Sequence, residues 1–313
     1  MLKTVGQRVL LSVPLILLVS AVTFVLQGLV PGDPARTLLG VNASEADYLK
    51  LRQALQLDEP FITRYGDYLG GMIQGDLGSS IFTSIPVATS ILQRLPVTLA
   101  LMIGAVVLAA VLGILLGVWS AVRGGTISKV LDGLSMAGFA IPNFWLGLLL
   151  VAAFAIAIPL FPATGYEPLA YGFSPWLLCL VLPWIALSLN GVATIAKVTR
   201  ESMLTSLNTD YIRTLRAAGV GRGSLVWKHS LRNAGIPVST MIGLTMIHCI
   251  SGTVFVENVF ALPGLGSLAV SAINNHDTPV TQGVVLTYTL LVVIINIAVD
   301  LVYTVLNPKV RVS

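Results

Sequence analysis

Long stretches without a charged residue are the feature of this sequence that most restricts its fold. A helix needs about 20 apolar residues to cross a hydrocarbon core about 30 Å thick, because each residue adds about 1.5 Å along the helix axis. Six stretches are long enough, and they lie between Arg8 and Asp33, Arg94 and Arg123, Asp132 and Glu167, Glu167 and Lys197, Arg232 and Glu257, and Asp277 and Asp300. The sequence therefore predicts an all-α polytopic membrane protein with six transmembrane helices.

Composition excludes an ordinary soluble protein. Only 10% of the 313 residues are charged and 55% are hydrophobic, whereas a soluble domain carries about 25% charged residues.

Small residues inside the predicted spans indicate how these helices pack. Gly113 and Gly117 are four positions apart, a spacing that lets two helix backbones approach closely, so we expect them at a helix contact.

The distribution of lysine and arginine predicts the orientation, since basic residues concentrate in cytoplasmic loops. With the N-terminus inside, thirteen of the 18 basic residues fall on the cytoplasmic side, and the other five share one outer segment with seven acidic residues. Both termini are therefore predicted to be cytoplasmic. The first stretch is expected to be a span and not a cleaved signal peptide, because no small-x-small cleavage site follows it before Pro31.

These observations divide the chain into three predicted parts: residues 1–32 as an N-terminal segment with the first transmembrane helix, residues 33–95 as an extracytoplasmic helical cap, and residues 96–313 as a five-helix core with a cytoplasmic loop at 197–234. In the cap, Ser44 followed by Asp47 predicts a helix start, and that helix is expected to run to about Gln56. A second turn and helix are expected from Asp58 to about Gly75.

Motifs for catalysis are scarce. No GxxxxGK[ST] motif occurs, so the chain has no P-loop for nucleotide phosphates, and residues 264–269 (GLGSLA) follow a predicted span instead of a strand. His229, His248 and His276 lie in separate segments, without zinc-ligand spacing or a serine-histidine-acid set. We expect no catalytic residue, no metal site and no nucleic-acid partner, and therefore not an enzyme.

Polar residues within the predicted spans are candidates for function, because burying them in a membrane is costly. Asn143, Asn190 and Asn296 lie deep in their spans, where they could line a translocation path or form hydrogen bonds across helices, and the sequence favours neither. Asp132 and Asp300 lie close to cytoplasmic ends of spans, so a structural ion pair is favoured over a substrate contact.

The segment from Lys197 to Arg232 combines dense basic charge with a particular residue order. It holds seven basic residues, opposed only by Glu201 and Asp210. An acidic residue suits the start of a helix and glycine suits its end. A short amphipathic helix is therefore expected to begin near Asp210, to end at Gly219 and to project as a knob.

This segment resembles the cytoplasmic EAA motif of the membrane-spanning permeases of ABC importers. Residues 211–219 (YIRTLRAAG) and 228–234 (KHSLRNA) are similar to the form found in B-type subunits of dipeptide and oligopeptide permeases. Gly219 takes the place of the motif glycine. The motif glutamate falls on Arg213, and the usual leucine-proline pair falls on residues 231–232 (LR), two departures from the general motif that resemble the B-type pattern.

The resemblance covers nearly the whole chain. Segments similar to family signatures follow one another in order: 31–34 (PGDP), 57–60 (LDEP), 75–80 (GDLGSS), 86–87 (PV), 94–99 (RLPVTL), 141–147 (IPNFWLG), 263–266 (PGLG), 300–303 (DLVY) and 307–309 (NPK). The last of these departs from the family's D-P-R. Each segment alone is weakly specific, but their order and spacing together identify the chain as similar to this family.

The resemblance implies a type I ABC importer permease fold and a transmembrane pore subunit of an ATP-driven importer for di- and oligopeptides in the bacterial cytoplasmic (inner) membrane. It implies a C-type permease partner, two ABC ATPase subunits and an extracytoplasmic substrate-binding protein, with ATP and Mg bound by the ATPases and no cofactor bound by this chain. The implied ATPase-docking coupling helix comprises Asp210, Tyr211, Arg213, Arg216, Ala217, Ala218 and Gly219, and the residues expected to face the binding protein include Asp58, Glu59 and Asp76.

Three alternatives remain at this point. Permeases for nickel, glutathione or another small solute resemble peptide permeases, and specificity in such systems resides largely in the separate binding protein. An ion-coupled secondary transporter would need a charged residue in mid-span and commonly carries internal repeats, and neither is evident. An intramembrane enzyme would depend on His248 and Cys249, but adjacent residues point to different faces of a helix.

Overall fold

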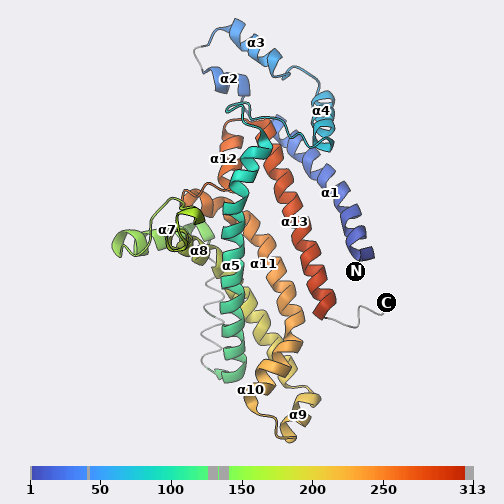
Figure 1. Cartoon of the computed structure of the whole chain (residues 1–313), viewed down its shortest axis with the longest axis vertical. Helices are drawn as coiled ribbons and strands as arrows, with labels where there is room; N and C mark the ends of the chain where they lie inside the picture. Colours follow the sequence, from blue (N-terminus) through green and yellow to red (C-terminus); the bar gives the residue numbers. More distant parts are fainter. Residues whose placement is uncertain (1, 41–42, 126–132, 134–140, 307–313) are drawn as a thin grey trace. The chain divides into compact units, whose positions relative to one another are not determined.

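A computed structural model describes residues 2–40, 43–125, 133 and 141–306 (Figure 1). Its elements are α1 (Leu2–Leu29), α2 (Pro34–Leu39), α3 (Glu45–Ala54), α4 (Phe61–Ile73), α5 (Val87–Arg123), α7 (Asn143–Val151), η1 (Ala152–Ala157), η2 (Leu169–Tyr171), α8 (Phe173–Leu207), α9 (Asp210–Ala217), α10 (Arg222–Ser224), η3 (Leu225–Ser230), α11 (Leu231–Val259), α12 (Leu265–Asn274) and α13 (Thr278–Leu306). Within these described ranges, β pairing is limited to one isolated bridge between Ser79 and Pro86. The predicted all-α class is confirmed.

Five helical segments are long and apolar enough to cross a membrane. They are Arg8–Leu29, Val87–Arg123, Phe173–Leu207, Arg222–Val259 and Thr278–Val302. The third predicted stretch contributes a shorter apolar helix at Asn143–Ala157, whereas Asp132 lies outside the described residues. A multi-pass helical architecture is therefore confirmed, and the sixth span stays a prediction.

The spanning helices extend past charged residues that bound the stretches which predicted them, and two of these extensions are the longest. Helix α8 continues past Lys197 to Leu207, and the helical segment that leads into α11 begins at Arg222 instead of Arg232. Charged residues limit how much of a helix lies in lipid, but lysine and arginine are good helix formers and do not end the helix itself. The predicted cytoplasmic loop is consequently mostly helical.

The chain separates into two compact units. The core unit comprises residues 99–262 and 294–306 among those described, and the cap unit comprises residues 2–98 and 263–293. Helices α5 and α13 each begin in the cap unit and continue into the core unit. The boundaries predicted at residues 32 and 95 stay predictions.

Close backbone approach defines the packing of the core unit. A β-carbon on Gly113 would come within 2.8 Å of the Ile195 side chain. One on Gly117 would come within 2.6 Å of the Ala196 carbonyl oxygen, so α5 packs directly against α8. On α8, Gly191 is similarly closed in by Thr245 of α11. The close contact expected from the Gly113 and Gly117 spacing is confirmed.

The cap unit has its own apolar cluster. Val87 and Ile91 at the start of α5 pack with Leu265 of α12 and Val284 of α13. A loop ahead of α5 is fixed to the same region by Asp277, which accepts a 2.5 Å hydrogen bond from the Ser80 hydroxyl. Residues far apart in the sequence therefore meet around a common core in this unit.

Local capping signals in the cap unit agree with the sequence prediction. The Ser44 hydroxyl accepts a 3.1 Å hydrogen bond from the backbone N–H of Asp47, so the predicted start of α3 is confirmed. Helix α3 ends at Ala54, slightly earlier than expected, because Gln56 adopts a left-handed φ of 54° that a right-handed helix cannot continue. The second predicted helix is present as α4, Phe61–Ile73.

The side chain of Asp33 connects α2 to α3. Its carboxylate caps α2 by accepting a 2.8 Å hydrogen bond from the backbone N–H of Ala35. The same side chain accepts hydrogen bonds from the Tyr48 hydroxyl at 2.9 Å and from Arg52 at 3.0 Å. One carboxylate thus joins α2 to α3.

Candidate functional site

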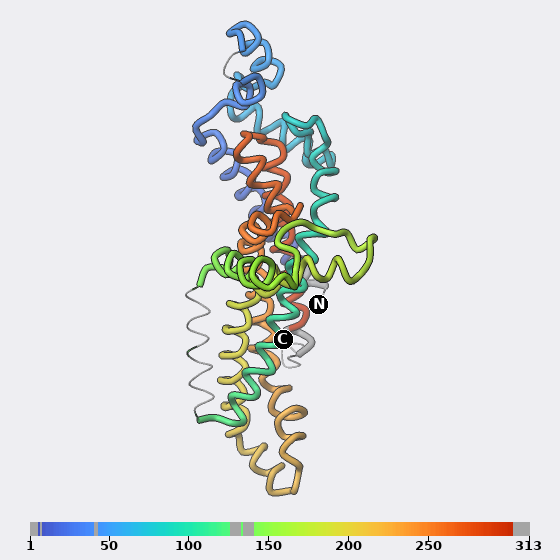
Figure 2. Tube along the Cα trace, turned by 90° about the vertical axis from the view of Figure 1, so that its left-hand side faces the viewer, coloured from blue at the N-terminus to red at the C-terminus, as the bar shows by residue number. Residues whose placement is uncertain are grey.

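Helix α9 lies at the end of the core unit where α8 and α11 are joined. The chain leaves α8 at Leu207, forms α9, and returns through α10 and η3 into α11 (Figures 1 and 2). Figure 2 shows this return as the yellow-to-orange turn of the trace beyond α8 and α11. Arg222 of α10 also donates a 3.2 Å hydrogen bond to the carbonyl of Val122, near the end of α5. Three long helices therefore converge next to α9.

Charge at the two ends of α9 matches the helix dipole. Asp210 occupies the first turn and Arg216 the last, so each charge faces the end of the dipole of opposite sign. An ion pair of 3.4 Å joins Arg213 to Asp210, but their side chains are 70% and 97% exposed, so it contributes little to stability. These charges are available to a partner surface.

A glycine in a left-handed conformation ends α9. Gly219 has φ +82°, and its N–H donates a 3.1 Å hydrogen bond to the carbonyl of Arg216. The N–H of Val220 donates a second bond, also 3.1 Å, to the carbonyl of Leu215. This pair of bonds is the Schellman motif, which satisfies carbonyls that a helix end would otherwise leave free. Both the predicted helix and its glycine end are confirmed.

Helix α9 is anchored on one face and exposed on the other. Ile212 is fully buried, and the Tyr211 hydroxyl accepts a hydrogen bond from the side-chain amide of Asn233 at the start of α11. Arg213, Arg216 and the alanines at 217 and 218 are exposed. The helix thus presents a small, mainly basic surface on a support that ties it to α11.

A shallow groove adjoins α9. It has a volume of about 400 Å³ and is lined by residues from α8, the following turn and the start of α11: Glu201, Ser202, Thr205, Ser206, Thr209, Asn233 and Pro237. Because Asn233 also holds Tyr211, the groove and the helix share one wall. Sequence reasoning missed Asn233, since its contact with Tyr211 spans 22 positions and no motif spacing signals it.

The structure brings two of the three candidate path residues together. The Asn190 amide donates a 3.2 Å hydrogen bond to the Asn143 side-chain oxygen, joining α8 to α7. The side-chain oxygen of Asn190 is buried and has no hydrogen-bond partner among the described residues. Asn296 is exposed on α13 and does not join this pair in the described hydrogen bonds. Interhelical hydrogen bonding is therefore present at Asn143 and Asn190, and a role in a path stays a prediction.

The three acidic residues expected to face a binding protein have different surroundings. Asp58 is exposed and pairs with Arg52, whose pKa is raised by this hydrogen bond and by one to Tyr48. Asp76 is exposed and accepts a 2.8 Å hydrogen bond from the N–H of Gly78, which orders the turn there. Glu59 is half-buried. Asp58 and Asp76 therefore lie on the surface, while Glu59 is partly covered.

Two known protein families match this chain, one over its N-terminal third and one over most of the remainder. Residues 113–312 match the family described as binding-protein-dependent transport system inner membrane component. Residues 1–102 match the N-terminal family described for the membrane components of the same transport systems. The two matches leave only residues 103–112 and the last residue outside.

Curated relatives match along their full length. A probable peptide ABC transporter permease protein of Sinorhizobium fredii is 37% identical, with 97% of this chain and 98% of that protein covered. The oligopeptide transport system permease protein AppB of Bacillus subtilis is 37% identical at the same coverage. The di/tripeptide transport system permease protein DppB of Pseudomonas aeruginosa is 34% identical, with 99% of both chains covered.

A solved structure has a similar fold. The methionine ABC transporter MetNI in an inward-facing conformation aligns with a TM-score of 0.57 over 69% of this chain and 96% of that chain, at 18% identity. At this identity the likeness concerns the fold alone. The sequence matches carry the family relationship.

Proposed function

This chain belongs to the family of binding-protein-dependent transport system inner membrane components, and from that membership we propose that it is the B-type pore subunit of an ABC importer for di- and oligopeptides. It is a multi-pass protein of the bacterial inner membrane. The observation that carries the proposal is the match of 97% of the chain to permeases named for peptide transport. We propose six spans with both termini in the cytoplasm.

The exposed face of α9 is the proposed docking surface for an ABC ATPase. Its buried Ile212 and the bond between Tyr211 and Asn233 support this role, because a helix that transmits force must be held firmly on the side away from its partner. Movement of the ATPase would then pass through α9 into α8 and α11. Two ATPase subunits, which bind ATP and Mg, supply the energy, and this chain hydrolyses no ATP itself.

The other proposed partners are a C-type permease, which completes the pore, and an extracytoplasmic substrate-binding protein. Asp58 and Asp76 support docking of the binding protein through their exposure, and Glu59 is proposed as a neighbour in the same surface. Asn143 and Asn190, with Asn296, are proposed to line the translocation path. The buried oxygen of Asn190 supports this, because an acceptor without a partner gains a hydrogen bond when helix movement admits solute or water.

Uptake measurements distinguish peptides from the alternative solutes. Cells that lack this chain, and the same cells complemented with it, would be given labelled dipeptide, labelled pentapeptide, nickel or glutathione in separate assays. We expect complementation to restore uptake of one or both peptides and to leave nickel and glutathione uptake unchanged. Restored nickel or glutathione uptake without peptide uptake would show that the permease serves another solute.

A further inference from the structure

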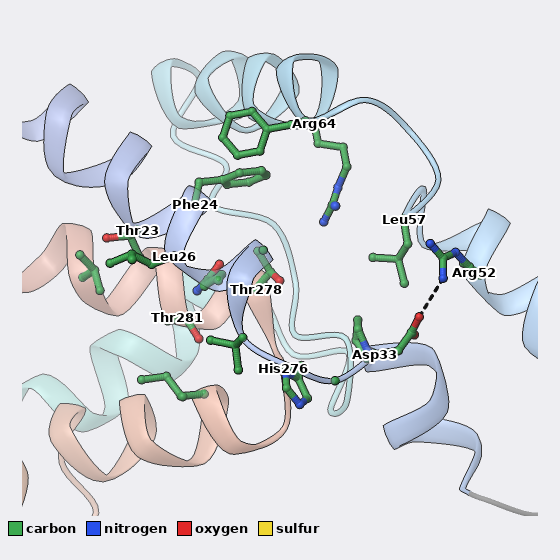
Figure 3. Close-up of a pocket in the computed structure, with 18 residues that line it drawn as sticks. Thr23, Phe24, Leu26, Asp33, Arg52, Leu57, Arg64, His276, Thr278 and Thr281 are labelled. Carbon is green, nitrogen blue, oxygen red and sulfur yellow. Dashed lines mark hydrogen bonds and ion pairs between the residues drawn. The ribbon is translucent and has the colours of Figure 1, made fainter.

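A cavity in the cap unit contains polar groups that the proposed coupling and docking surfaces do not use. Its volume is about 530 Å³, and it is lined by residues from the end of α1, from α2 to α4 and from the chain that runs from α12 into α13 (Figure 3). Apolar side chains such as Phe24 and Leu57 form much of its wall. Arg64 of α4 extends into the space, as Figure 3 shows.

Arg64 differs from the neighbouring arginines in having no carboxylate partner. Arg36 and Arg52 each form an ion pair of 3.0 Å within the cap unit. In the described parts of the chain Arg64 has no carboxylate within ion-pair distance, and its guanidinium carbon lies 5.6 Å from the centroid of the Phe24 ring. Burial and the charge of Arg52 lower the pKa of Arg64, and the charge of Glu59 acts in the opposite direction, but an arginine stays protonated. The cavity therefore contains a positive charge without a direct ion-pair partner among the described residues.

Buried amide groups beside this charge also lack partners. Both side-chain polar atoms of Gln27, which lines the cavity, are buried without a hydrogen bond among the described residues. A second cavity of about 400 Å³ shares Phe24, Leu57, Arg64 and Thr278 with the first. Its lining includes Gln282, whose side-chain nitrogen donates a 3.4 Å hydrogen bond to the carbonyl of Ser20. The side-chain oxygen of Gln282 has no hydrogen-bond partner among the described residues.

The unsatisfied groups define the chemistry of a ligand. Arg64 requires an anion, the Gln27 nitrogen requires an acceptor, and the oxygens of Gln27 and Gln282 require donors. The three amide atoms are buried, so a ligand reaches them when neighbouring side chains move. A carboxylate binds arginine through two parallel hydrogen bonds, and a peptide group supplies both a donor and an acceptor. A lipid phosphate supplies acceptors only, and the ammonium donor of an ethanolamine headgroup is separated from the phosphate by a flexible two-carbon arm, whereas a peptide group holds its donor and acceptor in one plane. The combination favours a short peptide over a phospholipid, and the apolar walls suit a side chain.

We propose that Arg64 and Gln27 form a subsite of the permease itself that binds the α-carboxylate and the adjoining peptide group of a short peptide. The subsite lies at the extracytoplasmic end of α1 in the proposed topology, where peptide is released by the binding protein. Asp67 lines the second cavity and suits the α-ammonium group of the same molecule. This inference rests on the proposed function, because it assigns a binding site to the proposed cargo.

Photo-crosslinking in the complete importer tests the subsite. The probe is alanyl-photoleucine, a dipeptide with a diazirine side chain, added to the importer with its binding protein in nanodiscs and illuminated during ATP turnover. We expect crosslinks on cavity residues of α1 and α4, which unlabelled alanyl-leucine prevents and alanyl-leucine amide does not. Arg64→Gln should lower the yield at least tenfold and Arg64→Lys should retain part of it. Arg36→Gln is the matched control, because Arg36 is exposed and does not line the cavity.

A second variant separates binding from folding. Gln27→Leu removes the unsatisfied amide and leaves a side chain of similar size, so we expect a higher melting temperature together with a lower crosslinking yield. An Arg64→Gln complex that assembles normally and crosslinks as well as the wild type would overturn the subsite. So would an absence of cavity crosslinks in a wild-type complex that imports the peptide. A wild-type complex that imports no peptide would instead overturn the proposed function and this inference with it.

Discussion

The requirement for glycine at position 219 comes from backbone conformation and not from lack of space. A β-carbon there would meet no atom within 4 Å, but φ is +82°. Placing a residue with a β-carbon in this left-handed region raises the conformational free energy by about 1–2 kcal/mol. A substitution is therefore expected to loosen the end of α9 without creating a clash.

Replacement of Gly219 by valine should reduce coupling. We expect Gly219→Val to lower peptide uptake by about tenfold, since about 1.4 kcal/mol corresponds to a factor of ten, and to lower ATP hydrolysis stimulated by the loaded binding protein. Gly221→Ala is the matched control, because Gly221 also has open space around it but a φ of −61° that alanine accepts. Equal uptake by both variants would argue against a mechanical role for α9.

Asp33 gives a second prediction at the scale of one residue. Burial acts to raise the pKa of Asp33, but hydrogen bonds from Tyr48 and from two backbone N–H groups, together with the charge of Arg52, place the pKa below its ordinary 3.8. A carboxyl group with a lowered pKa stabilises the fold above its unfolded pKa, and this contribution is lost as the pH falls through the folded pKa.

Asp33→Ala should therefore destabilise α2 and α3 at neutral pH. We expect faster hydrogen exchange of their amides, equivalent to about 1–2 kcal/mol for the lost cap, and a difference from the wild type that disappears as the pH falls below 3.8. Asp67→Asn is the control, since Asp67 is exposed and caps no helix. A difference that persisted undiminished at the lowest pH would contradict the role of the ionised carboxylate.

At the scale of elements, the contact between α5 and α8 is closed by backbone atoms. Gly117→Ala would place a β-carbon 2.6 Å from the Ala196 carbonyl oxygen, so one helix must move. We expect a loss of about 1–3 kcal/mol in stability, as for overpacking elsewhere, seen as a lower melting temperature of the purified protein. Gly70→Ala on α4 has no atom within 4 Å and should be neutral or slightly stabilising. A Gly117→Ala protein that melts at the same temperature as the wild type would show that α5 and α8 can move apart at little cost in stability.

The sequence predicts the ends of helices where the interactions that fix those ends are local. Ser44 starts α3 through a bond three residues away, and Gly219 ends α9 through bonds to the preceding turn, so neighbours in sequence suffice. The contact of Asn190 with Asn143 depends instead on how two helices are rotated against each other, which charge-free stretches do not specify. The cavity around Arg64 likewise draws on segments more than 200 positions apart, and no local pattern predicts it.

At the scale of the whole molecule, this chain is proposed to be one pore subunit that receives energy from a partner through α9. Its sequence has no P-loop, and its relatives are permeases of ABC transport systems. The central claim is therefore that movement enters this chain from an ATPase at α9. The protein that contacts α9 on the cytoplasmic side is then expected to be that ATPase.

Crosslinking from α9 in native membranes tests this claim most directly. Ala217→Cys places a thiol at an exposed position, and the two natural cysteines are buried and should react slowly. After treatment with a short thiol-reactive photo-crosslinker and purification in mild detergent, mass spectrometry would identify the attached protein. Ile73→Cys, 82% exposed on α4 of the cap unit, is the control position. We expect an ABC ATPase attached at position 217 and none at position 73. A complex that still imports peptide but shows no ATPase attached at position 217 would overturn the role of α9.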